Sequence, residues 1–103
     1  MELRFADLRL DLSTMTVERQ GRPIRLPPKC LHLLRIIMQA PHRVFSRTEL
    51  EMEVWGEPLP DSDTLRTHIY TLRKALSGPG EVDLIETVHG LGYRLAASDD
   101  HAT

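Results

Sequence analysis

The sequence predicts one α+β domain, in which a small antiparallel sheet is followed by three helices and a terminal β-hairpin. Three patterns predict it. Apolar residues alternate with polar ones over residues 3–26, recur at helical spacing between residues 28 and 76, and alternate again around a glycine-containing turn at 84–95. The chain has 103 residues, 41% hydrophobic and 27% charged, which suffices for one modest core.

The N-terminal segment has the two-residue period of half-buried strands. In "LRLDL", residues 8–12, leucine occupies every second position and charged residues stand between. Gly21 lies within "RQGRP", where a turn with positive φ would join two strands. We therefore predict strands at 3–5, 8–12, 15–19 and 22–26.

A helix surrounded by apolar neighbours is predicted next, over residues 28–40. Apolar side chains occupy most of its circumference, so it should be buried on several sides. Pro28 suits the first turn of this helix, and Pro41 ends it. Val44 and Phe45 are expected to form a short strand.

The second helix is predicted at residues 47–55 from the pattern that precedes it. Ser46 followed three residues later by Glu49 is typical of a capping box, and Gly56 is a typical helix end. An acidic loop with two prolines follows before the third helix.

The third predicted helix, residues 62–76, is amphipathic. Its apolar stripe consists of Leu65, Ile69, Leu72 and Leu76. The opposite side carries Thr67, Tyr70, Thr71 and Lys74, with Arg66 and Arg73 on its flanks. The hairpin at 84–95 completes the domain, and we expect 96–103 to be a flexible tail because it has nothing to bury.

The order of these elements indicates a function in DNA binding. The two later helices form a pair of the helix-turn-helix type, whose second helix fits a major groove about 12 Å wide. A hairpin directly after that helix can reach the adjacent minor groove. The formal net charge of −2 argues mildly against this function, although the distribution of charge matters more than its sum.

Other classes of function find less support in the sequence. The five histidines and one cysteine lack zinc-site spacing, and there is no glycine-lysine phosphate loop or nucleophile elbow, so we predict neither an enzyme nor a cofactor. A single cysteine allows no internal disulfide. With no apolar run long enough for a membrane and no signal-peptide pattern, a cytoplasmic location is expected.

Four stretches of the chain together resemble one family. "SRTEL" at 46–50, "VWG" at 54–56, "HIYTLRKAL" at 68–76 and "IETVHGLGYRL" at 85–95 are similar to the C-terminal effector domain of OmpR/PhoB-type response regulators. The resemblance implies a winged helix-turn-helix with a four-stranded N-terminal sheet, three helices and a hairpin wing, within a domain spanning residues 1–95.

The resemblance also implies partners. Members of this family bind promoter DNA, commonly as tandem protomers on direct repeats, so we expect a monomer in isolation and a tandem dimer on DNA. A receiver domain, controlled by a sensor kinase, normally precedes this domain. The loop at 57–63 matches a region that can touch RNA polymerase in the family, although a plain acidic connecting loop is an equally good interpretation.

The resemblance assigns roles to individual residues. Thr67, Tyr70 and Thr71 match positions in the major groove, and His68, Arg73 and Tyr93 match positions at the DNA backbone. The full set of predicted DNA-binding residues is Arg47, Trp55, Thr64, Arg66, Thr67, His68, Tyr70, Thr71, Arg73, Lys74, Thr87, His89 and Tyr93.

Several of these residues have an alternative structural interpretation. His68 borders the apolar stripe and is equally well explained as a half-buried structural histidine. Arg73 could form an intramolecular ion pair instead of a phosphate contact, and Arg47 could be a solvated arginine. Trp55 is expected to belong to the core first, with its indole N–H near the DNA backbone as a secondary role.

The chain also departs from the family pattern. Asp63 and Arg66 occupy positions where the family typically has arginine and then aspartate, Tyr70 and Thr71 replace frequent arginines, and His89 replaces a wing arginine with a shorter group that lacks a permanent charge. We therefore expect weak binding or an unusual sequence preference. The alternative is a protein-interaction module whose DNA face has decayed.

Overall fold

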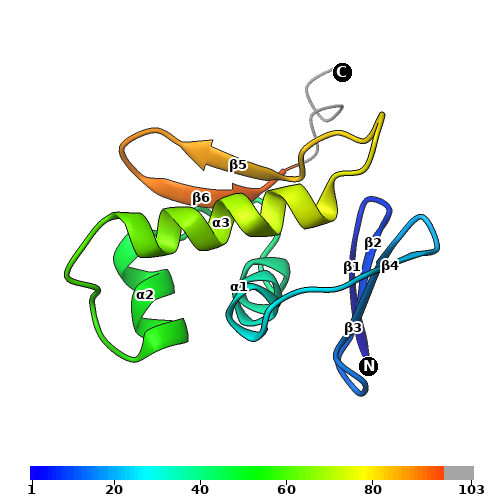
Figure 1. Cartoon of the computed structure of the whole chain (residues 1–103), viewed down its shortest axis with the longest axis horizontal. Helices are drawn as coiled ribbons and strands as arrows, with labels where there is room; N and C mark the ends of the chain where they lie inside the picture. Colours follow the sequence, from blue (N-terminus) through cyan, green and yellow to red (C-terminus); the bar gives the residue numbers. More distant parts are fainter. Residues whose placement is uncertain (97–103) are drawn as a thin grey trace.

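The helices and strands follow one another in the predicted order (Figure 1). A computed structural model describes residues 1–96. The strands and helices are β1 (Glu2–Phe5), β2 (Leu8–Asp11), β3 (Thr16–Arg19), β4 (Arg22–Ile24), α1 (Pro28–Met38), α2 (Arg47–Trp55), α3 (Asp63–Leu76), β5 (Ile85–Val88) and β6 (Gly92–Leu95). The prediction of an α+β chain with a four-stranded sheet, three helices and a hairpin is confirmed.

The N-terminal sheet is antiparallel throughout, with strands in the order β1-β2-β3-β4. Its inner face is apolar because alternate residues point the same way, and those buried there include Leu8, Leu10, Val17 and Ile24. The turn between β3 and β4 has positive φ at Gln20 (52°) and Gly21 (77°), as a two-residue hairpin with matched strand twist requires.

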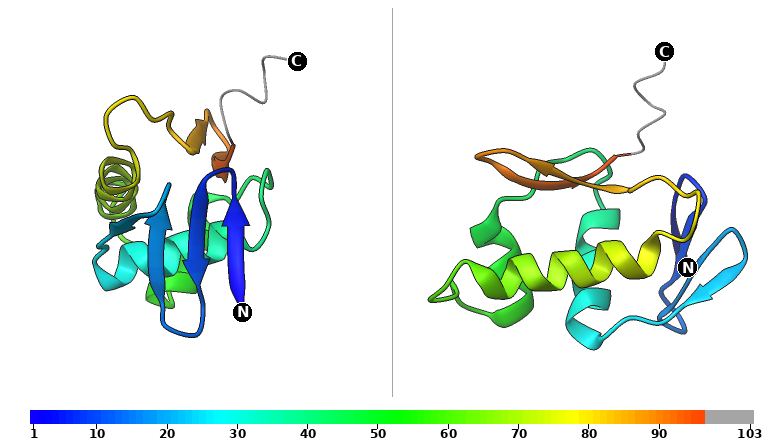
Figure 2. Two further views of the ribbon diagram at one scale, coloured as in Figure 1. Left: turned by 90° about the vertical axis from the view of Figure 1, so that its right-hand side faces the viewer. Right: turned by 45° about the horizontal axis from the view of Figure 1, so that its top comes forward.

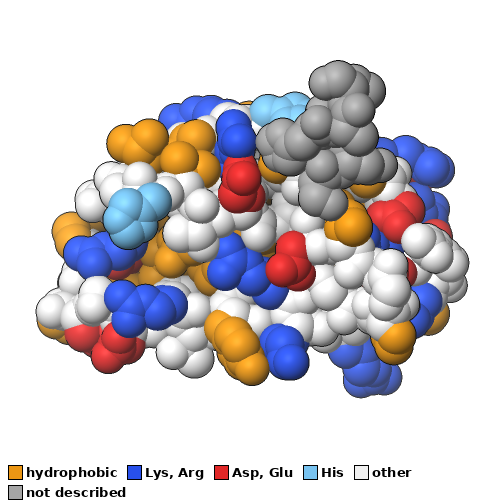
Figure 3. Space-filling view, turned by 90° about the horizontal axis from the view of Figure 1, so that it is seen from above, with side chains coloured by type: hydrophobic (Ala, Val, Ile, Leu, Met, Phe, Trp, Pro, Cys, Tyr) orange, Lys and Arg blue, Asp and Glu red, His pale blue; other side chains and the backbone are white. Residues whose placement is uncertain are grey.

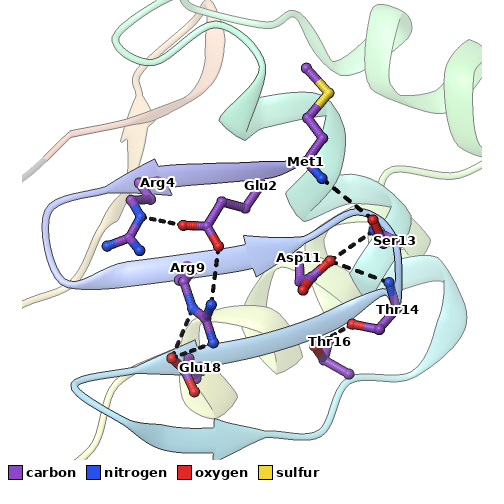
Figure 4. A network of polar contacts seen from close by, with 9 residues as sticks. All are labelled: Met1, Glu2, Arg4, Arg9, Asp11, Ser13, Thr14, Thr16 and Glu18. Atoms are coloured by element: carbon purple, nitrogen blue, oxygen red, sulfur yellow. Dashed lines mark hydrogen bonds and ion pairs between the residues drawn. The ribbon is translucent and has the colours of Figure 1, made fainter.

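The outer face of the sheet is held by a ladder of charges (Figure 4). Arg9 on β2 donates to Glu18 on β3 at 2.8 Å and to Glu2 on β1 at 3.0 Å. Arg4 lies directly opposite Arg9 in the register, and Glu2 bonds both guanidinium groups. The acids thus offset the repulsion between two like charges on neighbouring strands.

Helix α1 lies between the sheet and the other two helices (Figures 1 and 2). It packs against α2, α3, β1 and β6, and Leu33, Leu34 and Ile37 on it are completely buried. The expectation of a helix buried on several sides is confirmed. Figure 2 also shows the sheet at one end of the molecule and the β5–β6 hairpin alongside α3.

Local boundaries differ from the sequence prediction in small ways. Helix α1 ends at Met38, two residues early, because Gln39 and Ala40 donate to carbonyls only three residues back and so tighten the last turn. Of the expected strand at 44–45, Phe45 forms a single bridge, to Tyr93.

The tail boundary needs correction. Ala96 was expected to begin a flexible tail, but it is 7% exposed and donates its N–H to Leu84 at 2.8 Å. The backbone bond closes the base of the hairpin, so the folded part extends to residue 96. The rest of the predicted tail, 97–103, lies outside the described residues.

A buried arginine joins the N-terminal sheet to the segment that follows α3, and the sequence pattern did not indicate it. Arg19 on β3 is 1% exposed. Its guanidinium donates to Asp7 at 2.9 Å, to the carbonyl of Leu76 at the end of α3 at 3.0 Å, and to the carbonyl of Val82 at 2.9 Å. The N-terminal sheet is therefore fastened to the segment that leads from α3 into the hairpin.

We predict that Arg19→Met lowers the free energy of unfolding by about 2–4 kcal/mol, because two carbonyls lose their charged donor. Urea denaturation followed by circular dichroism measures this loss. Arg4→Met serves as the matched control, since Arg4 is 69% exposed and its loss should change stability little. Equal stability of the two variants would contradict the role given to Arg19.

Candidate nucleic-acid interface

Helix α3 presents one apolar and one polar side, as its sequence predicts. Leu65, Ile69, Leu72 and Leu76 are buried, each 1% exposed or less. Arg66, Thr67, Tyr70 and Lys74 are exposed, while Thr71 is half-buried. Tyr70 is 60% exposed, and the Lys74 ammonium lies 5.8 Å from the centre of its ring. The polar side of α3 is thus open to a ligand along more than two turns.

The first turn of α3 is capped from outside the helix. Ser62 makes no capping bond with its side chain. Instead, Asp61 accepts the backbone N–H groups of Asp63 at 2.9 Å and Thr64 at 2.8 Å, and also the Thr64 hydroxyl at 3.0 Å. The hydroxyl of Thr64, a predicted DNA contact, is therefore hydrogen-bonded to Asp61 at the start of the helix. These bonds, with the Thr64 amide as the largest influence, hold the pKa of the Asp61 carboxyl below its ordinary value of 3.8.

The reversed pair Asp63 and Arg66 forms an ion pair on the exposed face. Arg66 Nη1 lies 2.9 Å from Asp63 Oδ1, and the two side chains are 66% and 80% exposed. Such a pair contributes little to stability in water, about 0–1 kcal/mol. Its consequence is for binding, because the Arg66 guanidinium, a predicted DNA contact, already has an anionic partner.

His68 and Trp55 pack together where α2 meets α3. Their rings stand edge to face with centroids 5.0 Å apart, and His68 Nδ1 lies 2.7 Å from the Thr64 carbonyl. Cys30 donates to the carbonyl of His68 at 3.4 Å, and the Lys29 ammonium lies 5.8 Å from the Trp55 ring centre. This setting favours the structural interpretation of His68; the backbone contacts expected of His68 and Trp55 remain predictions.

Arg73 connects α3 to the hairpin formed by β5, β6 and their turn, residues 85–95, hereafter the wing. Its guanidinium donates to the Ile85 carbonyl at 3.0 Å and to the Thr87 hydroxyl at 2.5 Å. It also lies 6.0 Å from the ring centre of Tyr93. The sequence left open an internal ion pair for Arg73. Its partners are a carbonyl and a hydroxyl group instead of an acid, so the internal bonds that Arg73 makes are not the ion pair.

The wing is fixed to the body by its second strand. Tyr93 and Phe45 exchange two backbone hydrogen bonds, of 2.8 and 3.0 Å. Gly92 makes this approach possible: its φ is 150°, and a Cβ placed there would lie 2.0 Å from the Phe45 carbonyl oxygen. Arg94 pairs with Glu86 across the two strands.

The tip of the wing is exposed. His89 and Gly90 are exposed, and Leu91 keeps 65% of its surface accessible. In Figure 1 the wing runs beside α3, on the same side of α1. Seen from the wing side, Lys and Arg side chains are scattered among acidic and hydrophobic ones, without one continuous basic surface (Figure 3).

Arg47, in the first turn of α2, lies against a buried acid that sequence reasoning missed. Its Nε is 3.3 Å from Glu51 Oε2, and Glu51 is 1% exposed. The other oxygen of Glu51 accepts the backbone N–H of Leu59 at 3.1 Å, which anchors the 57–63 loop to α2. The i, i+4 spacing of Arg47 and Glu51 was visible in the sequence, but nothing there indicated burial.

A metal cluster and a membrane-spanning helix are both absent from the described residues. Within residues 1–96 there is no group of three or more His, Cys, Asp or Glu side chains arranged for a metal ion. No helix in that range combines the length and the apolar character that crossing a membrane requires.

Comparison with known proteins identifies the family. The profile of the family described as "Transcriptional regulatory protein, C terminal" matches residues 21–95. The chain belongs to this family. The resemblance to response-regulator effector domains is thereby confirmed, and the family is one of transcription regulators.

Relatives of known function include longer response regulators. The phosphate regulon transcriptional regulatory protein PhoB of Rhizobium meliloti is 44% identical over 94 residues, which are 90% of this chain and 41% of that protein. Response regulator MprA of Mycobacterium tuberculosis (strain H37Rv) is 40% identical over 96 residues, 92% of this chain and 42% of MprA. The chain thus spans about two fifths of the length of these relatives.

Solved structures of DNA-binding domains share the fold. The DNA-binding domain of CpxR from E. coli superposes with a TM-score of 0.82 at 26% identity, covering 95% of this chain and 98% of that one. The AdeR DNA-binding domain, solved in complex with an intercistronic region, gives a TM-score of 0.76 at 25% identity, covering 91% and 98%. The predicted winged helix-turn-helix is confirmed.

We predict that Gly92→Ala detaches β6 from Phe45. The new Cβ collides with a backbone carbonyl, and the φ of this position costs a residue with a side chain about 1–3 kcal/mol by itself. Hydrogen exchange of the Phe45 and Tyr93 amides should accelerate. Gly90→Ala is the control, because its φ is 77° with nothing within 4 Å of the added carbon. Equal exchange in the two variants would refute the docking role.

A second prediction concerns pH. Since the pKa of Asp61 is lowered in the folded state, its stabilisation is fully present above about 3.8, the ordinary pKa, and is lost as pH falls through the lowered value. Asp61→Ala should therefore destabilise the domain at pH 7, and the difference from the unmodified chain should shrink toward pH 2. Urea denaturation at both pH values measures it.

The control for this experiment is Asp61→Asn. Its amide oxygen can accept the same two N–H bonds, so most of the stability at pH 7 should be kept and the pH dependence lost. If Asp61→Ala is as stable as the unmodified chain at pH 7, the capping role is wrong.

Proposed function

We propose that this chain binds double-stranded promoter DNA in a sequence-dependent manner, as the effector domain of a two-component response regulator. Helix α3 would lie in the major groove and the wing in the adjacent minor groove. The observation that carries the proposal is the common orientation of these two elements, which Arg73 joins by two hydrogen bonds. The names of the relatives and the DNA complex of AdeR support the same function.

The electrostatic part of binding would rest on few groups. Lys74 is exposed at the end of α3, with the Tyr70 ring 5.8 Å from its ammonium. Arg66 and Arg94 are paired with acids, which offset part of their attraction to a phosphate. Arg73 keeps its full charge, but some of its N–H groups are bonded to the wing. Weak binding by the isolated chain is the expected result.

The remaining partners follow from the same proposal. Two copies would bind head to tail on direct repeats, and the chain alone would be a monomer. In the parent protein a receiver domain under a sensor kinase would control this cytoplasmic effector domain, whose bounds we place at 1–95 plus the buried Ala96. The 57–63 loop, held by Glu51, would be the surface offered to RNA polymerase.

The salt dependence of affinity tests the proposal. Four phosphate contacts would give a slope of about −3.6 in a plot of log affinity against log salt. Lys74→Ala should weaken binding to every duplex and reduce the slope by about 1. Arg4→Ala, on the outer face of the sheet, is the control and should change neither value. An unchanged slope for Lys74→Ala would show that the docking face is misassigned.

A protein-interaction module is the second candidate function. The acids Asp61 and Asp63 at the start of α3 favour it, since both are exposed where a phosphate backbone would approach. NMR mapping of backbone amide chemical shifts, with a DNA duplex added, distinguishes the two functions. Shifts in residues 64–74 and 87–93 support DNA binding, whereas their absence at millimolar duplex supports the interaction module.

A further inference from the structure

Both arginines of α3 are already bonded to protein groups. Arg66 pairs with Asp63 at 2.9 Å, and Arg73 is bonded to the wing. Arginine is the side chain that most often recognises guanine, through two hydrogen bonds in the major groove. The ion pair also occupies the Asp63 carboxylate, which is the kind of acceptor that recognises cytosine. At the start of α3, the two charged groups suited to a G·C pair, Arg66 and Asp63, are thus bonded to each other.

On the first turns of α3, the side chains that remain available to contact bases are two threonines and a tyrosine, which carry hydroxyl, methyl and aromatic groups instead of charges. Thr67 is exposed, Thr71 is half-buried, and between them stands the ring of Tyr70, 60% exposed. In recognition helices the N-terminal residues contact the base edges. Threonine methyl groups and aromatic carbons pack against the 5-methyl group of thymine, and the hydroxyls can bond either member of an A·T pair.

The wing tip also favours A·T pairs, for a different physical reason. His89 and Leu91 are exposed at the turn, with 65% of Leu91 accessible. Narrow minor grooves of A·T tracts attract histidine, and leucine is among the apolar residues that insert between base steps. A G·C pair places an amino group in the minor groove that an A·T pair lacks, so an apolar side chain fits better at A·T.

We infer that the DNA taken by this domain is A·T-rich at the bases under both elements and that thymine methyl groups are its main specific contacts in the major groove. The Asp63–Arg66 pair adds a modest bias against a guanine contact by Arg66, since breaking an exposed pair costs little free energy in water. The inference rests on the proposed function and specifies its DNA class.

Selection of bound duplexes from a random pool is the first experiment, using the 103-residue chain. The expected result is an enriched site with runs of A·T pairs at the α3 and wing positions. Failure to enrich any site from the pool would overturn the proposed DNA-binding function, and the inference with it. Enriched sites with invariant G·C pairs at the α3 positions would overturn the inference alone.

Base analogues then test the contacts in the selected duplex. Replacing one thymine by uracil removes only the methyl group and should lower affinity about fourfold at each contacted position. Replacing guanine by 7-deazaguanine removes the acceptor that arginine uses and should have no effect. Uracil without effect, together with a tenfold loss on 7-deazaguanine, would show that the domain recognises guanine.

Protein variants assign the contacts to residues. Thr67→Ser removes the side-chain methyl group and should abolish the uracil effect at one position, whereas the control Thr67→Val keeps the methyl group and the effect. Asp63→Asn frees Arg66 and should enrich a guanine at one position in a repeated selection. An unchanged selected site for Asp63→Asn would contradict the role assigned to the ion pair.

Discussion

The close approach of β6 to Phe45 is the constraint on which the rest of this structure depends. The segment leading into α2 lies directly beside the second strand of the wing at Phe45, joined by two backbone hydrogen bonds where Gly92 has no side chain to separate them. Arg73 supplies the second fastening, from α3 to β5. Because the wing is held at both strands, it stays beside α3, and a duplex can meet both at once.

Internal pairing governs how charge is used in this molecule. The formal net charge is −2, and the structure assigns most described arginines to acids or carbonyls. Arg19 fastens the sheet, Arg73 positions the wing and Arg66 balances Asp63. A domain with few unpaired cations gains little from non-specific attraction, which is why the DNA binding proposed above is assigned to shape and apolar contact to a larger degree.

Much of the fold and part of the candidate site could be predicted from local patterns. The alternation in the sheet, the Ser46–Glu49 capping box, the αL conformation of Gly56 and the apolar stripe of α3 each depend on residues within a turn or two. The exposure of Thr67 and Tyr70 followed from the helical period alone. Boundaries were less certain, because α1 ends two residues early in a tight turn and Ala96 is buried by its bond to Leu84.

The sequence by itself determined which residues form each element and which side of each helix is apolar, since both depend on period and capping among near neighbours. Only the tertiary structure decided which charged groups are free. Arg19 bonds Val82, 63 positions away, Arg73 bonds Ile85, 12 positions away, and the burial of Glu51 depends on the loop that folds over it. A local pattern cannot reveal such partners, because their distance is set by the packing of whole elements.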